Sequence, residues 1–257
     1  MNDVRAPAEE IRRRGFTVLP ALYPETWVRT LRTALEAVYD AAGRPPTVSS
    51  GHVVDGASDT TPTAAGFAVR QILKVRPDLA PLLLRDEMVA VLRAALGEDM
   101  VLEIAGGLLS EPSRPFFKWH NHIGGIDDYR WEKRSDYPRS EVPQRVLVLV
   151  YLQPITPALG SLLVLPRTSS DPIAPPAPIE ARHWDGEVVV EAPAGTAVLL
   201  EQSTWHAALP QTTDMLRMLL GLYFASPSAP PGAGTDEGLL TLETDVPLLR
   251  SVLRNRS

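Results

Sequence analysis

The sequence contains no cysteine. Disulfide bonds, thiolate metal ligands, iron–sulfur clusters and cysteine nucleophiles are therefore all excluded. An excess of basic residues is also lacking, because 31 Asp and Glu outnumber 25 Lys and Arg and the formal net charge is −6. This balance gives no electrostatic reason to expect a nucleic acid or an anionic membrane as a partner.

Long hydrophobic runs are absent as well. None reaches the roughly 20 apolar residues that span a bilayer, and the polar segment 1–10 lacks the apolar stretch of a secretory signal. We therefore expect a cytoplasmic protein. Its 257 residues, 44% hydrophobic and 22% charged, suit a single folded domain with a large core.

The first half of the chain predicts helices. From Pro24 to Ala42, apolar residues recur at spacings of three and four, which is typical of one face of an amphipathic helix, and Gly43 ends it. A second helix is predicted from Asp86 to Leu96, with Asp86 as its N-cap. Between them, residues 45–65 are rich in Ser, Thr, Gly, Pro and Asp and predict a long loop.

Beyond residue 97 the pattern changes to short apolar runs that Pro and Gly separate. Such runs indicate an all-β sandwich or barrel, so we expect a mainly β fold against which the helices pack. The predicted strands are 100–109, 145–152, 161–165, 187–191, 196–200 and 215–224. The tail over 239–253 predicts a final helix.

Two of the five histidines, His120 and His122, are two residues apart. In an extended strand such residues point to one face, so both imidazoles can converge on a metal ion. The alternative is a His-x-His pair on the surface.

His206 follows a predicted strand and lies eleven residues before Arg217. Arg217 interrupts an otherwise apolar strand, where a guanidinium is costly unless a partner neutralises it. That partner is either a carboxylate of the protein or an anionic cosubstrate.

Four segments together resemble the phytanoyl-CoA dioxygenase family of non-haem Fe(II)/2-oxoglutarate oxygenases. They are Arg14–Pro20, Trp119-His120, Gly160–Pro166, and Trp205–Asp214 with Arg217. The last block, which contains the family's distal histidine, is the most specific match. The resemblance covers most of the chain.

The resemblance implies a double-stranded β-helix, a cupin-like jelly roll, with the N-terminal helices packed on one sheet. It implies one domain over 1–257, with helical support in 1–97, the barrel core in 98–225, and a loop and tail in 226–257. The implied cofactor and cosubstrates are Fe(II), 2-oxoglutarate and O2. By the same resemblance, His120 and His206 are expected to bind the iron, and Arg217 is expected to bind the far carboxylate of 2-oxoglutarate. Tyr151, on a predicted core strand, is a further candidate for hydrogen bonding to the cosubstrate, and core packing is the alternative.

His122 stands where the family has an aspartate or glutamate. Three interpretations follow: His120, His122 and His206 form an all-histidine triad, Asp127 or Asp128 supplies the carboxylate instead, or the metal site is degraded. An all-histidine triad leaves the metal one charge unit more positive than a carboxylate triad does. Imidazole also suits zinc and other first-row ions, whereas Arg217 favours an oxygenase.

Four residues are candidates for substrate contact: Lys118, Trp119, Asp127 and Asp128. Packing is the alternative for Trp119, and exposure to solvent is the alternative for the other three. The predicted function is oxidation of a C–H bond of a small molecule by hydroxylation, desaturation or cyclisation in specialised biosynthesis. The enzyme is predicted to act as a monomer or homodimer, with neither nucleic acid nor membrane as partner. The alternatives are an inactive cupin-like metal- or ligand-binding protein, and an all-histidine metal enzyme that does not use 2-oxoglutarate.

Overall fold

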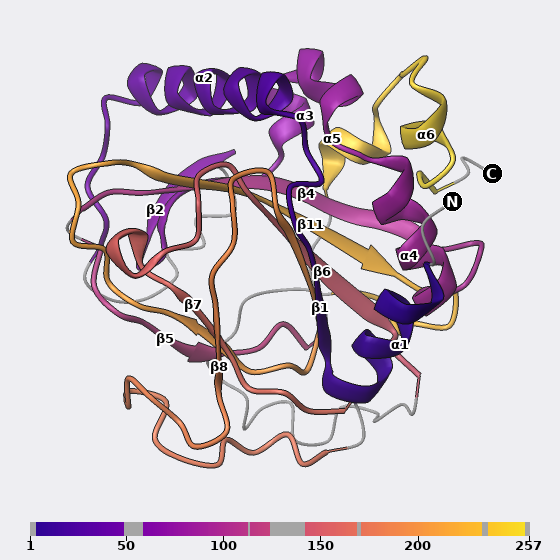
Figure 1. The fold of residues 1–257 in the computed structure, drawn as a ribbon. Coiled ribbons are helices and arrows are strands. Elements are labelled where there is room, and N and C mark those ends of the chain that lie inside the picture. The colour runs from indigo at the N-terminus through magenta and orange to yellow at the C-terminus, as the bar shows by residue number, and fades with distance from the viewer. Residues whose placement is uncertain are drawn as a thin grey trace.

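Two antiparallel sheets face each other, and helices cover the outer side of the larger sheet (Figure 1). The two sheets share a buried apolar layer but do not close into a barrel within the described part of the chain. This arrangement is the predicted mainly β fold with helical decoration. The computed structural model describes residues 4–48, 59–112, 114–123, 142–168, 171–232 and 236–254.

The larger sheet has seven strands in the order β1-β9-β6-β11-β4-β3-β2. Every neighbouring pair is antiparallel. The strands are β1 Phe16–Leu19, β9 Ala197–Glu201, β6 Arg145–Tyr151, β11 Arg217–Ala225, β4 Val101–Ser110, β3 Gly66–Val69 and β2 Thr60–Thr63.

Three of these strands, β1, β2 and β3, come from the part of the sequence predicted to be helical or loop. The predicted loop over 45–65 was wrong where it included β2. This strand contains Pro62, which reads as a loop residue. It is tolerated because β2 lies at the edge of the sheet, where a missing N–H breaks no central ladder.

The smaller sheet has four strands in the order β5-β10-β7-β8. They are β5 Phe117–His120, β10 His206–Ala208, β7 Leu162–Val164 and β8 Val188–Val190. A short 3-10 helix, η3 Pro157–Leu159, precedes β7.

The helices α2, α3 and α4 lie against the outer face of the larger sheet. The predicted apolar stripe of α2 is confirmed, because the residues at that spacing are buried. Gly107 of β4 makes room for α2 at the crossing, since a Cβ there would lie 2.6 Å from Cδ2 of Leu35. Asp86 was predicted to be the N-cap of α4, but the structure makes it the first helical residue, and Arg85 is the N-cap. The bounds are α1 Arg5–Arg14, α2 Glu25–Ala41, α3 Ile72–Val75, η1 Pro77–Leu82 and α4 Asp86–Leu96.

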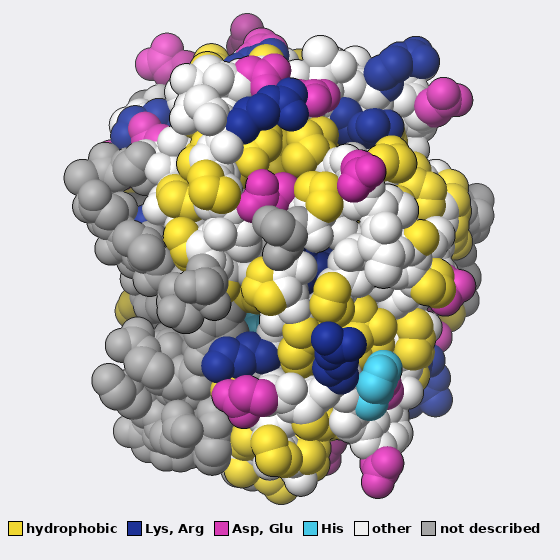
Figure 2. All heavy atoms as spheres, turned by 90° about the vertical axis from the view of Figure 1, so that its left-hand side faces the viewer, with side chains coloured by type: hydrophobic (Ala, Val, Ile, Leu, Met, Phe, Trp, Pro, Cys, Tyr) yellow, Lys and Arg dark blue, Asp and Glu magenta, His cyan; other side chains and the backbone are white. Residues whose placement is uncertain are grey.

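The C-terminal tail forms two short helices, α5 Glu237–Leu240 and α6 Pro247–Arg250, and not the predicted single one. Pro247 explains the break, because proline lacks an N–H and opens a helix more readily than it continues one. No helix in the described residues is long and apolar enough to cross a membrane. On the face shown in Figure 2, acidic and basic side chains are interspersed among hydrophobic ones.

Candidate functional site

A cavity of ≈ 360 Å³ lies between the two sheets. It is built from β4, β6 and β11 on one side and from β5, β7 and β10 on the other, with the β2–β3 hairpin contributing to its wall. A volume of this size suits a small-molecule ligand. Most of the wall is apolar: Ile104, Leu108, Phe117, Leu147, Leu149, Leu162 and Leu219.

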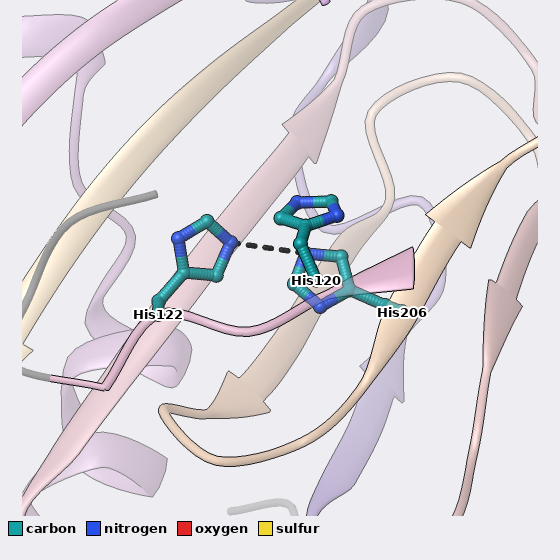
Figure 3. A group of neighbouring side chains, drawn as sticks. All are labelled: His120, His122 and His206. Atoms are coloured by element: carbon teal, nitrogen blue, oxygen red, sulfur yellow. Dashed lines mark hydrogen bonds between the residues drawn. The ribbon is translucent and has the colours of Figure 1, made fainter. Parts of the chain in front are cut away.

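Three histidines meet in this cavity. His120 ends β5, His206 begins β10, and the two are paired neighbours in the smaller sheet. His122 follows just beyond β5. All three are buried, one nitrogen of each lies within 4.8 Å of the others, and Figure 3 shows the rings converging. The predicted triad is therefore brought together in space.

A β-bulge turns His120 into the cavity. His206 pairs with His120, but the residue two positions further along β10 pairs with Phe117, so three steps in β5 oppose two in β10. Such a bulge re-aims side chains. As a result Phe117 and His120 both line the cavity, with ring centroids 4.5 Å apart. The bulge lies before His120 in the sequence, so it leaves the two-residue spacing of His120 and His122 unchanged. The backbone N–H of His122 donates to the Gln202 carbonyl at 2.8 Å, which holds the segment just beyond β5 in place.

Hydrogen bonds at Nδ1 orient two of the imidazoles. The Nδ1 of His120 lies 2.9 Å from the Lys118 carbonyl oxygen, and that of His206 lies 3.0 Å from the Thr204 carbonyl oxygen. A carbonyl oxygen only accepts, so Nδ1 carries the proton in both rings and Nε2 keeps its lone pair. These two histidines are therefore prepared to bind a metal through Nε2.

His122 has a different partner. Its Nδ1 lies 3.0 Å from the hydroxyl of Tyr223, and its Nε2 lies 3.0 Å from Nε2 of His206. A hydroxyl both donates and accepts, so it accommodates either tautomer of His122. With a metal ion at Nε2, Nδ1–H would donate to the Tyr223 oxygen. Sequence reasoning missed Tyr223, although its even spacing from Arg217 along β11 places both residues on the cavity face.

The donor set fits a first-row metal ion. Two imidazole nitrogens, each about 2.1 Å from a shared ion and at right angles, lie about 3.0 Å apart. The His122–His206 separation of 3.0 Å agrees with this value. Neutral imidazoles suit iron, zinc, copper and nickel, so the site fits iron without selecting it.

Arg217, at the start of β11, lines the same cavity and is 6% exposed. Its Nη2 donates to the Tyr151 hydroxyl at 3.2 Å, and its Cζ lies 5.2 Å from the centroid of that ring. No carboxylate of the described residues pairs with Arg217. Burial raises the pKa of Tyr151, so its phenol stays protonated at neutral pH. Arginine and phenol together can hold a carboxylate.

Two of the predicted substrate residues, Lys118 and Trp119, lie away from the cavity wall. Lys118 is exposed and pairs with Glu180 at 3.2 Å. Trp119 is fully buried and, like Lys118, is not part of the cavity wall. Asp127 and Asp128 lie outside the described residues.

Trp119 belongs to a cluster of three tryptophans. It stacks on Trp184 with a centroid distance of 4.3 Å and an interplanar angle of 7°, and Trp184 meets Trp205 edge-on at 5.6 Å. Each indole N–H donates to a carbonyl within 173–181, at distances of 3.0 to 3.1 Å. The cluster ties that segment to the two strands that carry His120 and His206, so packing is the role the structure shows for Trp119.

The phytanoyl-CoA dioxygenase family model matches residues 11–219. The chain belongs to this family. Its members are non-haem iron, 2-oxoglutarate-dependent oxygenases, and Fe(II), 2-oxoglutarate and O2 are their cofactor and cosubstrates. The resemblance seen in the sequence is thereby confirmed. No match to a curated protein sequence was found.

Solved structures share the fold. The non-haem α-ketoglutarate-dependent carbocyclase SnoK from nogalamycin biosynthesis has a TM-score of 0.65 at 20% identity, covering 94% of each chain. AviO1 from Streptomyces viridochromogenes has a TM-score of 0.62 at 19% identity, covering 90% of this chain and 99% of its own. HygX from Streptomyces hygroscopicus, with nickel and 2-oxoglutarate bound, has a TM-score of 0.61 at 17% identity, covering 87% of each chain. These likenesses confirm the predicted cupin-like fold.

Proposed function

We propose that this protein is an Fe(II)/2-oxoglutarate-dependent oxygenase that oxidises a C–H bond of a small molecule. One observation carries the proposal. Three buried imidazoles converge in the same cavity as a buried arginine that has no carboxylate partner among the described residues. The first feature suits a metal ion and the second suits the far carboxylate of a dicarboxylic acid.

Each residue then has a distinct task. His120, His122 and His206 hold the iron. Arg217 and Tyr151 hold the far carboxylate of 2-oxoglutarate and so fix its keto acid end toward the histidines. Bound iron would supply O2 activation. In a hydroxylation one oxygen atom enters the product and the other enters succinate, which forms from 2-oxoglutarate with release of CO2.

The all-histidine interpretation has the best support of the three. His122 faces His206 and is fixed at both ring nitrogens, so it does not turn away from the cluster. Three neutral ligands leave Fe(II) with its full double charge. Anionic 2-oxoglutarate should therefore be held more tightly than at a site with a carboxylate ligand.

A small-molecule substrate fits the apolar walls of the cavity. Structural relatives come from nogalamycin biosynthesis, and HygX has been solved with hygromycin B bound. We extend this to a role in specialised biosynthesis. We also propose that residues 1–257 act as one domain, in the cytoplasm, as a monomer or homodimer.

Anaerobic titration tests the proposal. Fe(II) followed by 2-oxoglutarate should give the visible charge-transfer band of a chelated keto acid. His206→Ala should lose iron binding, while Arg217→Gln should keep iron and lose 2-oxoglutarate. His183→Ala is the matched control, because the His183 side chain is 63% exposed and pairs with Glu187. Bound iron without the band would refute 2-oxoglutarate as cosubstrate, and wild-type protein that binds no iron would refute the metal site.

His122→Asp and His122→Ala separate the three interpretations of position 122. The aspartate variant should bind iron and show lowered or altered turnover, whereas the alanine variant should bind iron more weakly. Iron binding by His122→Ala that equals the wild type would show that another residue completes the site. An enzyme that is inert both before and after His122→Asp would indicate a degraded site.

A further inference from the structure

A second buried arginine, Arg114, lines the same cavity as Arg217. It lies between β4 and β5 and is only 2% exposed. Its Nη1 donates to the carbonyl oxygens of Pro115 at 2.9 Å and Ala208 at 3.3 Å, and its Nη2 donates to that of Leu209 at 2.5 Å. Three backbone carbonyls therefore hold the guanidinium in one place.

The charge of Arg114 is not compensated. Its Nε–H has no acceptor among the described residues, and no carboxylate of these residues forms an ion pair with it. Burial, followed by the positive charge of Arg217, lowers the pKa of Arg114 to about 9. The group is still protonated at pH 7. A buried cation beside another cation is costly, and a bound anion would offset that cost.

Arg114, Arg217 and Tyr151 line the same cavity and lie near enough to interact electrostatically. Arg217 donates to the Tyr151 hydroxyl, and both arginines lower the pKa of that phenol against the larger raising effect of burial. Arg217 pairs in the sheet with Ser110, the last residue of β4, four residues before Arg114. Gly160, at a φ of 78°, makes room for the guanidinium, since a Cβ there would lie 3.2 Å from Nη2 of Arg114.

We propose that Arg114 and Arg217 together bind one carboxylate, the far carboxylate of 2-oxoglutarate, as a paired-arginine site with Tyr151 at its edge. The inference rests on the proposed function and adds a binding residue to it. Two guanidinium groups around one anion explain why two cations are buried together although no protein carboxylate of the described residues pairs with either one. The alternative occupant of Arg114 is an acidic group on the substrate.

Calorimetric titration of the Ni(II)-loaded protein with two keto acids tests this. 2-Oxopentanoate has the chain of 2-oxoglutarate but ends in a methyl group, so it lacks the far carboxylate. Arg114→Gln should weaken 2-oxoglutarate binding by about 10- to 100-fold and change 2-oxopentanoate binding less than about threefold. Arg70→Gln is the matched control. Arg70 also lines the cavity, but it follows β3, which pairs with β4 on the edge opposite to β11 and Arg217. It should leave the Kd of both acids nearly unchanged.

The outcomes separate the inference from the proposed function. Wild-type protein that binds 2-oxoglutarate, with Arg114→Gln binding it equally well, overturns the inference alone and points to an acidic group on the substrate. An equal loss of affinity for both keto acids also overturns the inference, because Arg114 would then only maintain the shape of the cavity and not bind the far carboxylate. Wild-type protein that binds no 2-oxoglutarate refutes the proposed function itself. If Arg114→Gln does not fold, Arg114→Lys replaces it, with a smaller loss expected for 2-oxoglutarate alone.

Discussion

Two tyrosines in the cavity provide a crossed test of the site. The Tyr223 hydroxyl lies 3.0 Å from Nδ1 of His122. The Tyr151 hydroxyl accepts a hydrogen bond from Nη2 of Arg217 at 3.2 Å. Removing either hydroxyl as Tyr→Phe removes that hydrogen bond and changes almost no volume. We expect Tyr223→Phe to weaken metal binding and Tyr151→Phe to weaken 2-oxoglutarate binding.

The magnitude for Tyr223→Phe follows from what its hydroxyl does. It is the hydrogen-bond partner that fixes the Nδ1 side of His122, and loss of such a partner lowers metal affinity by about 10- to 100-fold. This corresponds to about 1.4 to 2.8 kcal/mol. Tyr151→Phe removes the hydroxyl that is proposed to donate to the far carboxylate of 2-oxoglutarate, and a hydrogen bond to a charged group typically contributes about 1.5 to 3 kcal/mol. That loss should appear in the Kd of 2-oxoglutarate and leave the Kd of the metal within about twofold.

The assay is a pair of calorimetric titrations for each variant, first with Ni(II) and then with 2-oxoglutarate at saturating metal. Each variant serves as the control for the other, since both lose one phenolic hydroxyl from the same cavity. A metal Kd for Tyr223→Phe within about twofold of the wild type would refute the reasoning, because His122 would then be held without Tyr223. Equal losses in both variants would instead indicate a general loosening of the cavity.

Two further predictions concern stability. Trp119→Ala should lower the free energy of unfolding by about 3 to 5 kcal/mol and also weaken metal binding. Leu31→Ala in α2 should lower the free energy of unfolding by about 2 to 5 kcal/mol and leave metal binding intact. Denaturant unfolding and metal titration measure the two effects, and equal metal affinities for the two variants would contradict the structural link from Trp119 to His120. Burial raises the pKa of Glu201 above 4.5, so the folded chain holds this proton more tightly than the unfolded chain and stability falls as the pH rises through the folded pKa. Glu201→Gln should therefore raise Tm most at pH 8 and less as the pH falls towards 4.5, and a gain independent of pH would exclude the buried charge as its cause.

Several features were determined by the sequence alone, because they depend on neighbours along the chain. The apolar stripe of α2 and the runs of β6, β9 and β11 follow from local periodicity, and the structure places them close to their predicted bounds. His206 and Arg217 stood out as polar residues beside apolar strands. The wrong predictions arose where local signals were weak: the tail, in which Pro247 divides the helix, and β2, whose Pro62 is acceptable only at a sheet edge.

Tertiary structure alone decided how the site is assembled. Tyr223 reaches His122 across 101 positions in the sequence, and Arg114 is held by the Leu209 carbonyl across 95. The bulge that turns His120 inward depends on its pairing with β10. No local pattern records such contacts, because they form only when the two sheets pack and place distant residues at one wall. The sequence named the three histidines of the cavity and one arginine, and packing supplied the residues that orient the imidazoles and add a second positive charge.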